Sequence, residues 1–334
     1  MRLVTRADFD GLVCGALITA MEEIDSYLFV EPKFMQDGMV EIRPKDIIAN
    51  LPYHPNCSLW FDHHITNADA WLRHVGTLHP EEGRGPLGTL RPPSSIIPGK
   101  GGFRIAPSAA RVVYEYYTMI GNRQQAIGNR KIQKGLEVLG SERMTFLLKN
   151  TDKIDAGKLT PDDVLHPAGY VLISMTIDGV RPQDEPYWLK LIDLFRDATL
   201  EETLQEPEVQ LRCQQVLEAQ ERLKEILLKT TTLKGNVIFI DLRGIKDIPD
   251  GNRFLVFTLF PTGNISLKIA DDSQRPNTTA ISVGYNIFNT TSEVNVGALM
   301  EKYGGGGHRV VGSCRVPNHE AEKAIGEILE AIRE

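Results

Sequence analysis

Residues 1–66 alternate between short apolar runs and one longer stretch with helical spacing. Apolar side chains recur on one face between Leu12 and Glu23, which predicts a helix there. The short runs predict four strands, over Arg2–Arg6, Tyr27–Val30, Ile47–Leu51 and the stretch from Ser58 that ends in Phe61-Asp62-His63-His64. Strands that alternate with helices predict a mostly parallel sheet with helices on its faces.

The segment from Gly76 to Pro107 contains thirteen Gly or Pro among its thirty-two residues. This composition predicts a long loop without regular elements, of the kind that often serves as a lid or a binding loop. Pro107-Ser108 then predicts the start of a helix over Ala109–Met119. A fifth apolar run, Thr145–Leu148, precedes a second acidic group that includes Asp152 and Asp155.

Residues 185–229 are charged, with apolar side chains at helical spacing, and they predict helices that connect two domains. A partner-binding coiled coil is the alternative, but the heptad pattern is not sustained.

A new α/β pattern starts at Gly235. Its expected strands are Val237–Leu242, Phe254–Leu259, Ile265–Ile269, Ala280–Tyr285 and Val310–Val316, and its expected helices are Val296–Tyr303 and Glu320–Arg333.

The predicted fold is therefore a two-domain α/β protein. The N-terminal domain, residues 1–180, has a mostly parallel sheet with flanking helices, and a helical connector follows over residues 181–232. The C-terminal domain, residues 233–334, is smaller and has a mixed sheet. A chain of 334 residues agrees with two domains, because single cores rarely grow to that length.

Composition excludes several classes of protein. The apolar fraction of 42% and the charged fraction of 24% are ordinary for a globular protein. No apolar stretch is long enough to span a bilayer, and the N-terminus has no signal-peptide layout, so no membrane partner is expected. The four cysteines have no paired spacing, which argues against disulfides and zinc knuckles and suits a reducing cytoplasm.

The net charge of −7 hides a basic segment. Between Arg84 and Lys131 there are eight basic residues against one acid, Glu115. Such a local excess can attract an anion to one face of the protein, and Arg111 is the candidate for substrate contact. For any single arginine in this segment, a solvated basic surface is the simpler interpretation.

Two polar motifs lie at the ends of predicted strands. Asp8-Phe9-Asp10-Gly11 follows the first strand, and Asp62-His63-His64 ends the fourth. Because ligands of open α/β sheets bind at the carboxyl ends of strands, these side chains are candidates for a divalent metal site built from oxygen and nitrogen ligands. The alternative is that the aspartates cap the following helix and the histidines are ordinary loop residues.

A third motif, Gly304-Gly305-Gly306-Gly307-His308-Arg309, follows a predicted helix. Glycines let backbone N–H groups approach an anion closely, and Arg309 can hold a phosphate through two parallel hydrogen bonds. A helix C-cap is the alternative, although one glycine would suffice for it.

Together, the three motifs resemble the DHH phosphoesterases that carry a DHH-associated C-terminal domain. The resemblance covers nearly the whole chain, and the group named exopolyphosphatase-related proteins is the most similar. It implies a DHH metal-binding catalytic domain, a substrate-binding C-terminal domain and one or two Mn²⁺ ions, with Mg²⁺ as the alternative ion. Two such ions clamp a phosphoryl group and activate a water.

The resemblance also implies a role for each motif residue. Asp10, His63 and Asp152 would hold one ion and Asp8 the other, while Asp62 would orient the histidine pair. His64 would face the scissile phosphate or the leaving group. Substrate would be held by the C-terminal motif, that is, by Gly304, Gly305, Gly306, Gly307, His308 and Arg309.

Two positions depart from the family pattern. Val4 stands where many members have histidine, and Asn50 stands where members have an aspartate that bridges both metals. An amide oxygen can ligate a cation, but it adds no negative charge. Three outcomes stay open: Asp37, Asp46 or Asp155 replaces the missing ligand, only one ion binds tightly, or the centre is not catalytic.

The predicted function is hydrolysis of phosphodiester or phosphomonoester bonds in short single-stranded oligonucleotides or small nucleotides such as pAp. Inorganic polyphosphate is the alternative substrate, because it lacks bases and few aromatic side chains are clustered for stacking. A regulatory protein that binds nucleotides without cleaving them is the alternative from another class. A homodimer is one of the oligomeric states that the sequence leaves open.

Overall fold

The computed structural model describes residues 1–70, 95–124 and 130–333. It divides into two compact units. The first contains Met1–Leu159 and Ala168–Cys213, and the second contains Thr160–Pro167 and Gln214–Glu334. The segment predicted as a connector, residues 181–232, is thus shared between the units, and the predicted domain bounds stay a prediction.

The first unit is built on a mostly parallel sheet, as the sequence predicts. Its six described strands lie in the order β2-β1-β3-β4-β6-β5, and only the β5–β6 pair is antiparallel. The strands are β1 (Arg2–Thr5), β2 (Ser26–Phe29), β3 (Ile47–Ala49), β4 (Leu59–Asp62), β5 (Ser95–Ile97) and β6 (Gly101–Phe103).

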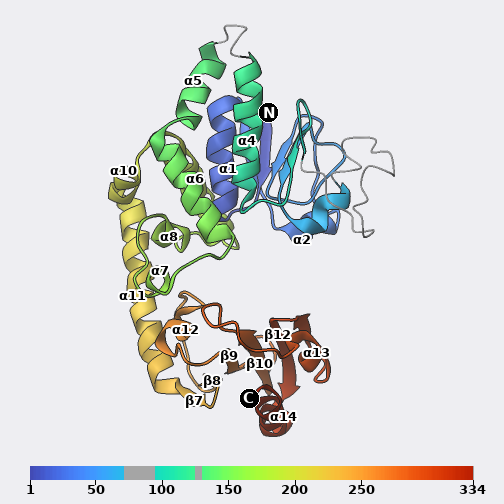
Figure 1. The fold of residues 1–334 in the computed structure, drawn as a ribbon, viewed down its shortest axis with the longest axis vertical. Helices are drawn as coiled ribbons and strands as arrows, with labels where there is room; N and C mark the ends of the chain where they lie inside the picture. Colours follow the sequence, from blue (N-terminus) through green and yellow to red (C-terminus); the bar gives the residue numbers. More distant parts are fainter. Residues whose placement is uncertain (71–94, 125–129, 334) are drawn as a thin grey trace. The chain divides into compact units, whose positions relative to one another are not determined.

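Helix α1 (Phe9–Met21) is buried on nearly all sides. A helix that is apolar around its whole circumference needs other elements to cover it. Figure 1 shows α1 beside α4 (Ala109–Gln124), and α9 (Glu185–Asp197) also packs against it. The helix begins three residues earlier than Leu12, because the Asp8 side chain accepts a hydrogen bond from the Gly11 N–H as its N-cap.

Five further helices of the described residues complete the first unit. They are α2 (Pro32–Gln36), α5 (Arg130–Leu139), α6 (Glu142–Asp155), α8 (Gly169–Ser174) and α10 (Leu200–Gln205), with single 3₁₀ turns at Ile65–Asn67 and Pro182–Asp184. Helix α11 (Pro207–Thr230) runs from the first unit into the second. The helices predicted over residues 185–229 and 109–119 are confirmed.

The predicted loop over Gly76–Pro107 is wrong for its last third; residues 76–94 lie outside the described residues. Strands β5 and β6 form there and extend the sheet beyond β4. Glycine makes this pairing possible, because a Cβ on Gly101 would lie 2.0 Å from the Trp60 carbonyl oxygen. Gly101 therefore indicates close approach of two strands and not a loop.

Two other apolar runs adopt a different element from the expected one. The fifth run, Thr145–Leu148, belongs to helix α6, which Ser141 caps by accepting from the Met144 N–H. The run predicted as strand Phe254–Leu259 forms helix α12 (Leu255–Leu259). Short apolar runs without alternation do not distinguish a buried helix from a buried strand.

The second unit has the predicted mixed sheet. Its six described strands lie in the order β11-β12-β10-β9-β8-β7, and only β8 and β9 are parallel. Alternate residues of β10 and β12 are buried, as expected for strands with one face on a core. The strands are β7 (Thr231–Lys234), β8 (Val237–Asp241), β9 (Ile265–Asp271), β10 (Thr278–Tyr285), β11 (Gly306–His308) and β12 (Val311–Pro317).

Helices α13 (Val296–Glu301) and α14 (Asn318–Ile332) share an apolar core with this sheet, and α7 (Pro161–Leu165) packs on α12. All four cysteines are buried, and none of them forms a disulfide within the described residues. Among the described helices, none is long and apolar enough to cross a bilayer.

Candidate functional site

The two N-terminal motifs meet at one edge of the first sheet. Asp8 follows β1 and caps α1, and Asp10 lies in the first turn of that helix. Asp62 ends β4, and His63 and His64 follow it. Because β1, β3 and β4 are parallel neighbours, their carboxyl ends lie at the same edge. The predicted convergence of these motifs is therefore present.

Asp10 is held by a helix N-terminus. It is 2% exposed, and its two carboxylate oxygens accept from the N–H groups of Ala109 and Ala110 at 2.8 and 2.9 Å. These N–H groups open α4 and carry part of the positive end of its dipole. Burial and the nearby carboxylates of Asp155 and Asp8 nevertheless raise the pKa of Asp10 well above its usual value.

His63 presents one ring nitrogen to these carboxylates. Its Nδ1 lies 3.0 Å from the carbonyl oxygen of Ala106. A carbonyl only accepts, so Nδ1 donates to it, and in the neutral form of the ring Nε2 has the lone pair. Nε2 is buried and has no hydrogen-bond partner among the described residues, and it lies 3.3 Å from Asp155 Oδ2 and 4.0 Å from Asp10 Oδ2.

Asp10, His63 and Asp155 together fit a divalent cation. Each offers one ligand atom, and the three atoms lie within 4.8 Å of one another. Burial also raises the pKa of Asp155, against the opposing effect of His63. A buried lone pair and two carboxylates that repel each other are stabilised by a positive ion between them. Oxygen and imidazole donors suit Mn²⁺, Mg²⁺ or a similar ion.

Asp152, the sequence-predicted ligand, does not join this cluster. Its carboxylate accepts from the Ser108 hydroxyl at 2.7 Å and from the Arg111 guanidinium, which also forms an ion pair with it. Arg111, expected to contact substrate, is thus engaged in holding Asp152. Asp155, one helical turn further along α6, faces His63 instead.

Asp62 orients only one of the two histidines. It is fully buried, and its Oδ1 lies 2.8 Å from His64 Nδ1, while Asn67 donates to its other oxygen. The hydrogen bond from His64 to Asp62 raises the pKa of His64. The His64 side chain is 52% exposed, so its other nitrogen is accessible to a substrate.

Asp8 and Asn50 lie beside the cluster and bond to each other. The Asn50 side-chain amide donates to Asp8 Oδ1 at 3.0 Å. Burial raises the pKa of Asp8, and the neighbouring Arg6 opposes this shift. Among the described His, Cys, Asp and Glu residues, Asp8 does not belong to a group of three clustered ligands.

The glycine run of the second unit has mainly structural tasks. Gly304 has φ +70° and ends α13, and the N–H groups of Gly304 and Gly305 donate to carbonyls of that helix. These two N–H groups are not available to an anion. Gly306, Gly307 and His308 form β11, which leaves His308 and Arg309 exposed at the hairpin.

Arg309 lines a cavity of about 850 Å³ in the second unit. The cavity has apolar walls from α11, α12 and the sheet, and Arg253 and Lys268 also line it. In the described part of the chain, none of these three cations forms an ion pair, and Asp250 is the acidic residue of the lining. Arg253 stacks on Phe254, with 4.7 Å between the guanidinium carbon and the ring centroid. A cavity with these properties suits an anion that also carries a flat apolar ring.

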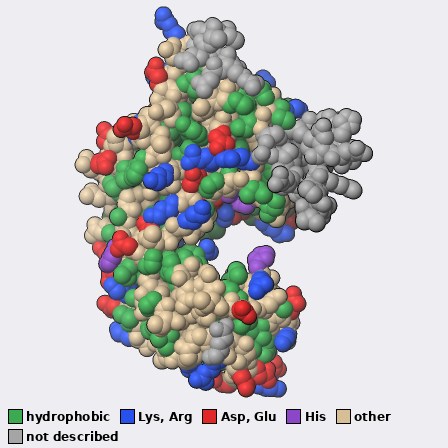
Figure 2. Space-filling model, in the orientation of Figure 1, with side chains coloured by type: hydrophobic (Ala, Val, Ile, Leu, Met, Phe, Trp, Pro, Cys, Tyr) green, Lys and Arg blue, Asp and Glu red, His purple; other side chains and the backbone are tan. Residues whose placement is uncertain are grey.

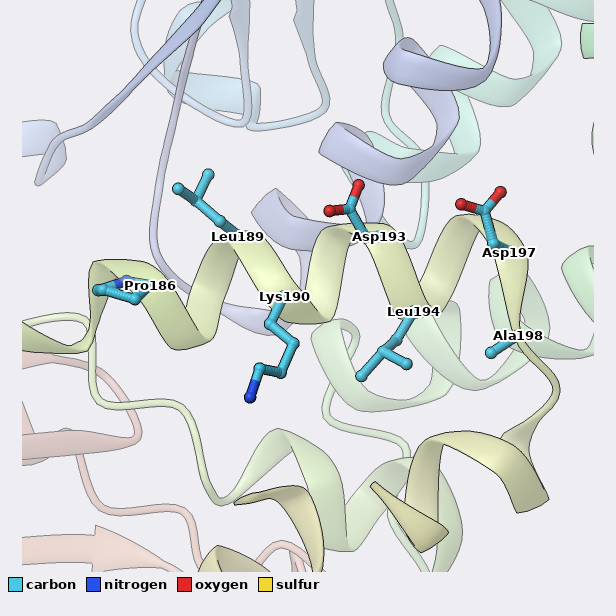
Figure 3. A pocket seen from close by; sticks show the side chains of 7 residues that line it. All are labelled: Pro186, Leu189, Lys190, Asp193, Leu194, Asp197 and Ala198. Atoms are coloured by element: carbon cyan, nitrogen blue, oxygen red, sulfur yellow. The ribbon is translucent and has the colours of Figure 1, made fainter. Parts of the chain in front are cut away.

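A hollow along α9 is a poor candidate site (Figure 3). It is lined by one helix, from Pro186 to Ala198, and contains none of the motif residues. Its charged groups are already paired, because Lys190 donates to Glu206 and Glu208, and Arg196 pairs with both aspartates of the lining.

Three basic residues of the segment between Arg84 and Lys131 form ion pairs, and one of them is the Arg111 pair with Asp152. Arg104 pairs with Glu115, and Lys131 pairs with Glu23. Figure 2 shows basic side chains across one face of the first unit with acidic side chains among them. Arg84 and Arg91 lie outside the described residues, so the predicted role of this loop as a lid or binding loop is not tested.

A scan against protein-family models and a search of curated proteins gave no match. Among solved structures, the fold is similar to PggH of Vibrio cholerae, described as a pGpG-specific phosphodiesterase, with 32% identity over 99% of this chain and 98% of that chain and a TM-score of 0.79. A DHH-domain protein described as a member of the s1p family of ribosomal proteins matches at 14% identity over 100% and 87%, with a TM-score of 0.51. An exopolyphosphatase-related protein from Bacteroides fragilis matches at 12% identity over 98% and 91%, with a TM-score of 0.47.

Proposed function

Because this chain belongs to the DHH family of metal-dependent phosphoesterases, which act on nucleotides or oligonucleotides, we propose that it cleaves short 5′-phosphorylated oligonucleotides such as pGpG. The observation that carries the proposal is the buried Nε2 of His63, which faces Asp155 and Asp10 and has no hydrogen-bond partner in the described part of the chain. Similarity to PggH over the whole chain supports a dinucleotide as the substrate.

We assign the ion to Asp10, His63 and Asp155, and propose Mn²⁺ as the ion. When bound, a divalent ion supplies a Lewis acid that activates water and neutralises charge on a phosphoryl group. Asp10 is positioned for this task by the first N–H groups of α4, and His63 by the Ala106 carbonyl. Ligands whose other atoms are fixed in this way need little reorganisation on binding.

His64 is the proposed general acid. Hydrolysis adds the water oxygen to phosphorus and breaks the bond between phosphorus and the 3′ oxygen, which must take up a proton as it leaves. The Asp62 carboxylate stabilises protonated His64 and orients its ring, so the exposed nitrogen of His64 can donate that proton. The products are two 5′-mononucleotides.

The cavity of the second unit is the proposed nucleotide-binding site. Lys268, Arg253 and Arg309 supply positive charge for phosphate, and Phe254 supplies an aromatic surface for a base. Inorganic polyphosphate would use the cations but not the apolar walls. This cavity therefore favours a nucleotide over polyphosphate as the substrate.

The proposal is tested by incubating the protein with Mn²⁺ and, in separate reactions, pGpG, pAp, a longer oligonucleotide or polyphosphate. We expect pGpG to be converted to GMP fastest and all turnover to stop with EDTA. Faster release of phosphate from polyphosphate would reject the nucleotide proposal. Binding of pGpG without cleavage over a range of metals would identify a regulatory protein instead.

A further inference from the structure

The carboxylate of Asp8 already has two hydrogen-bond donors and one cation around it. Its Oδ1 accepts from the Gly11 N–H at 2.8 Å and from the Asn50 amide at 3.0 Å. Its Oδ2 lies 3.2 Å from Arg6 NH1. Each donor directs positive charge at the oxygens that a cation would need.

Asn50 presents a donor rather than an acceptor to Asp8. The residue is 3% exposed and has a left-handed backbone with φ +56°, and its N–H donates to the Phe61 carbonyl at 3.0 Å. This backbone fixes the side chain toward Asp8. An amide NH₂ group in that place repels a cation, whereas a carboxylate would attract it.

Arg6 is fixed by two carboxylates from different elements. Besides Asp8, its guanidinium lies 3.3 Å from Glu31, which follows β2. The Arg6 side chain is 42% exposed, but its Nε is buried, so contact with a phosphate is left to the two terminal nitrogens, Nη1 and Nη2. A guanidinium stays charged at every working pH and can bind a phosphate through two hydrogen bonds.

The other candidate replacement ligands are engaged elsewhere. Asp37 pairs with Lys33, and Asp46 pairs with Arg2. The described part of the chain contains two groups of three clustered ligands, and both include His63. In the second group, Asp62 and His64 are hydrogen-bonded to each other, so only the group with Asp10 and Asp155 is free to hold an ion.

We propose that this enzyme has a single-ion centre and that the Arg6 guanidinium contacts the substrate phosphate where a second ion would otherwise bind beside Asp8. The ion count rests on the residues around Asp8 alone, whereas the role of Arg6 toward substrate rests on the proposed function. The Arg6 guanidinium, paired with Asp8 and Glu31, repels a second dication because both carry positive charge, and the Asn50 amide adds no negative charge that would attract one.

The ion count is measured without substrate, by Mn²⁺ titration calorimetry combined with electron paramagnetic resonance. We expect one Mn²⁺ per chain and the spectrum of an isolated ion. Two ions of similar affinity, or the spectrum of a coupled pair, would overturn the single-ion centre. Because no turnover is involved, failure of the substrate assignment leaves this measurement valid.

Substitution at Arg6 tests the second half of the proposal. Arg6→Gln is expected to lower kcat/KM by about 10²–10³-fold, the usual loss when one charge-stabilising group is removed, with Mn²⁺ still at one per chain. Arg6→Lys should restore part of kcat/KM. Arg196→Gln, which removes an ion-paired arginine on α9 instead, is the control and should leave kcat/KM unchanged. An unchanged kcat/KM in Arg6→Gln would overturn the role of Arg6.

The double variant Arg6→Ala with Asn50→Asp is designed to let a second Mn²⁺ ion bind beside Asp8. It removes the guanidinium and supplies the missing carboxylate, so we expect a second Mn²⁺ to bind. A count that stays at one in the folded double variant would show that Arg6 and Asn50 do not set the number of ions.

Discussion

Two aspartates one helical turn apart have different tasks at the residue scale. Asp152 is satisfied by Ser108 and Arg111, and Asp155 faces the free nitrogen of His63. The ion pair of Asp152 with Arg111 stabilises the fold through its hydrogen bonds. The carboxylate of Asp155 is not held in such a pair by any described residue, so it is a candidate metal ligand. The two positions can therefore be separated by experiment.

We expect Asp155→Asn to weaken Mn²⁺ binding by more than about 100-fold, because even the outer partners of metal ligands are worth 10–100-fold. Asp152→Asn should keep Mn²⁺ affinity but lower the free energy of unfolding by about 1.5–3 kcal/mol through the lost charged hydrogen bonds. Calorimetric titration and urea unfolding measure the two quantities. The reverse pattern would make Asp152 the ligand.

Mn²⁺ affinity should fall as the pH is lowered. The pKa values of Asp10 and Asp155 are raised by burial, so both carboxyls take up protons above the ordinary aspartate value of 3.8. Protons then compete with the ion, and binding releases them. Titration in buffers of different ionisation enthalpy measures this release. An affinity that does not change through the acidic range would contradict the assignment.

The same pKa shift sets the stability of the metal-free protein. A raised pKa in the folded state means that the stability from protonating Asp155 is present below pH 3.8 and is lost as the pH rises through the raised pKa. At neutral pH, Asp155→Asn removes this unfavourable charge. We therefore expect the metal-free variant to melt no lower than the metal-free parent, but to gain nothing from added Mn²⁺.

At the scale of elements, the edge of the sheet depends on the short hairpin of β5 and β6. This hairpin leads into the segment with Ala106, whose carbonyl sets the proton on His63, and into α4, whose N–H groups hold Asp10. Strand pairing at Gly101 is therefore coupled to the geometry of the site.

Two glycines of this hairpin form a matched pair for substitution. Gly101→Ala places a Cβ 2.0 Å from the Trp60 carbonyl oxygen, so β4 and β6 must separate. In Gly99→Ala, the added Cβ has no described atom within 4 Å. The substitution lowers the free energy of unfolding only because alanine disfavours the backbone φ of +74°, by about 1–2 kcal/mol. Urea unfolding should show the larger loss for Gly101→Ala, together with weakened Mn²⁺ binding. Equal losses would show that the pairing is not tight.

The sequence predicted elements well where periodicity was long, as in α4, α11 and β10. It failed for β5 and β6, where glycine allowed close packing, and for α12, whose four apolar residues were too few to show a helical period. The choice of Asp152 as a metal ligand was limited in the same way, because the secondary structure of the apolar run before it could not be read from the sequence. With residues 142–155 recognised as a helix, Asp152 and Asp155 fall one turn apart, but only tertiary contacts show which of them faces His63.

At the scale of the whole molecule, metal and nucleotide binding are assigned to different units. The ion ligands lie in the first unit and the cationic cavity in the second. Interactions that hold a substrate equally in the ground state and the transition state change KM rather than kcat. The two units should therefore give different kinetic signatures.

We expect Lys268→Ala to raise KM for pGpG about 10-fold, the value of one charged contact, with kcat and Mn²⁺ affinity near those of the parent. Lys323→Ala is the matched control, since this lysine lies on α14 with 82% of its side chain exposed. Steady-state kinetics give both constants. An unchanged KM in Lys268→Ala would exclude the cavity from substrate binding.

The most direct test of the metal centre is anomalous diffraction from a crystal soaked in Mn²⁺. We predict one strong anomalous peak with Asp10, His63 Nε2 and Asp155 at ligand distance, about 2.0–2.2 Å. A peak ligated by Asp152 or by Asn50 and Asp8, or no peak at this edge of the sheet, would contradict the account.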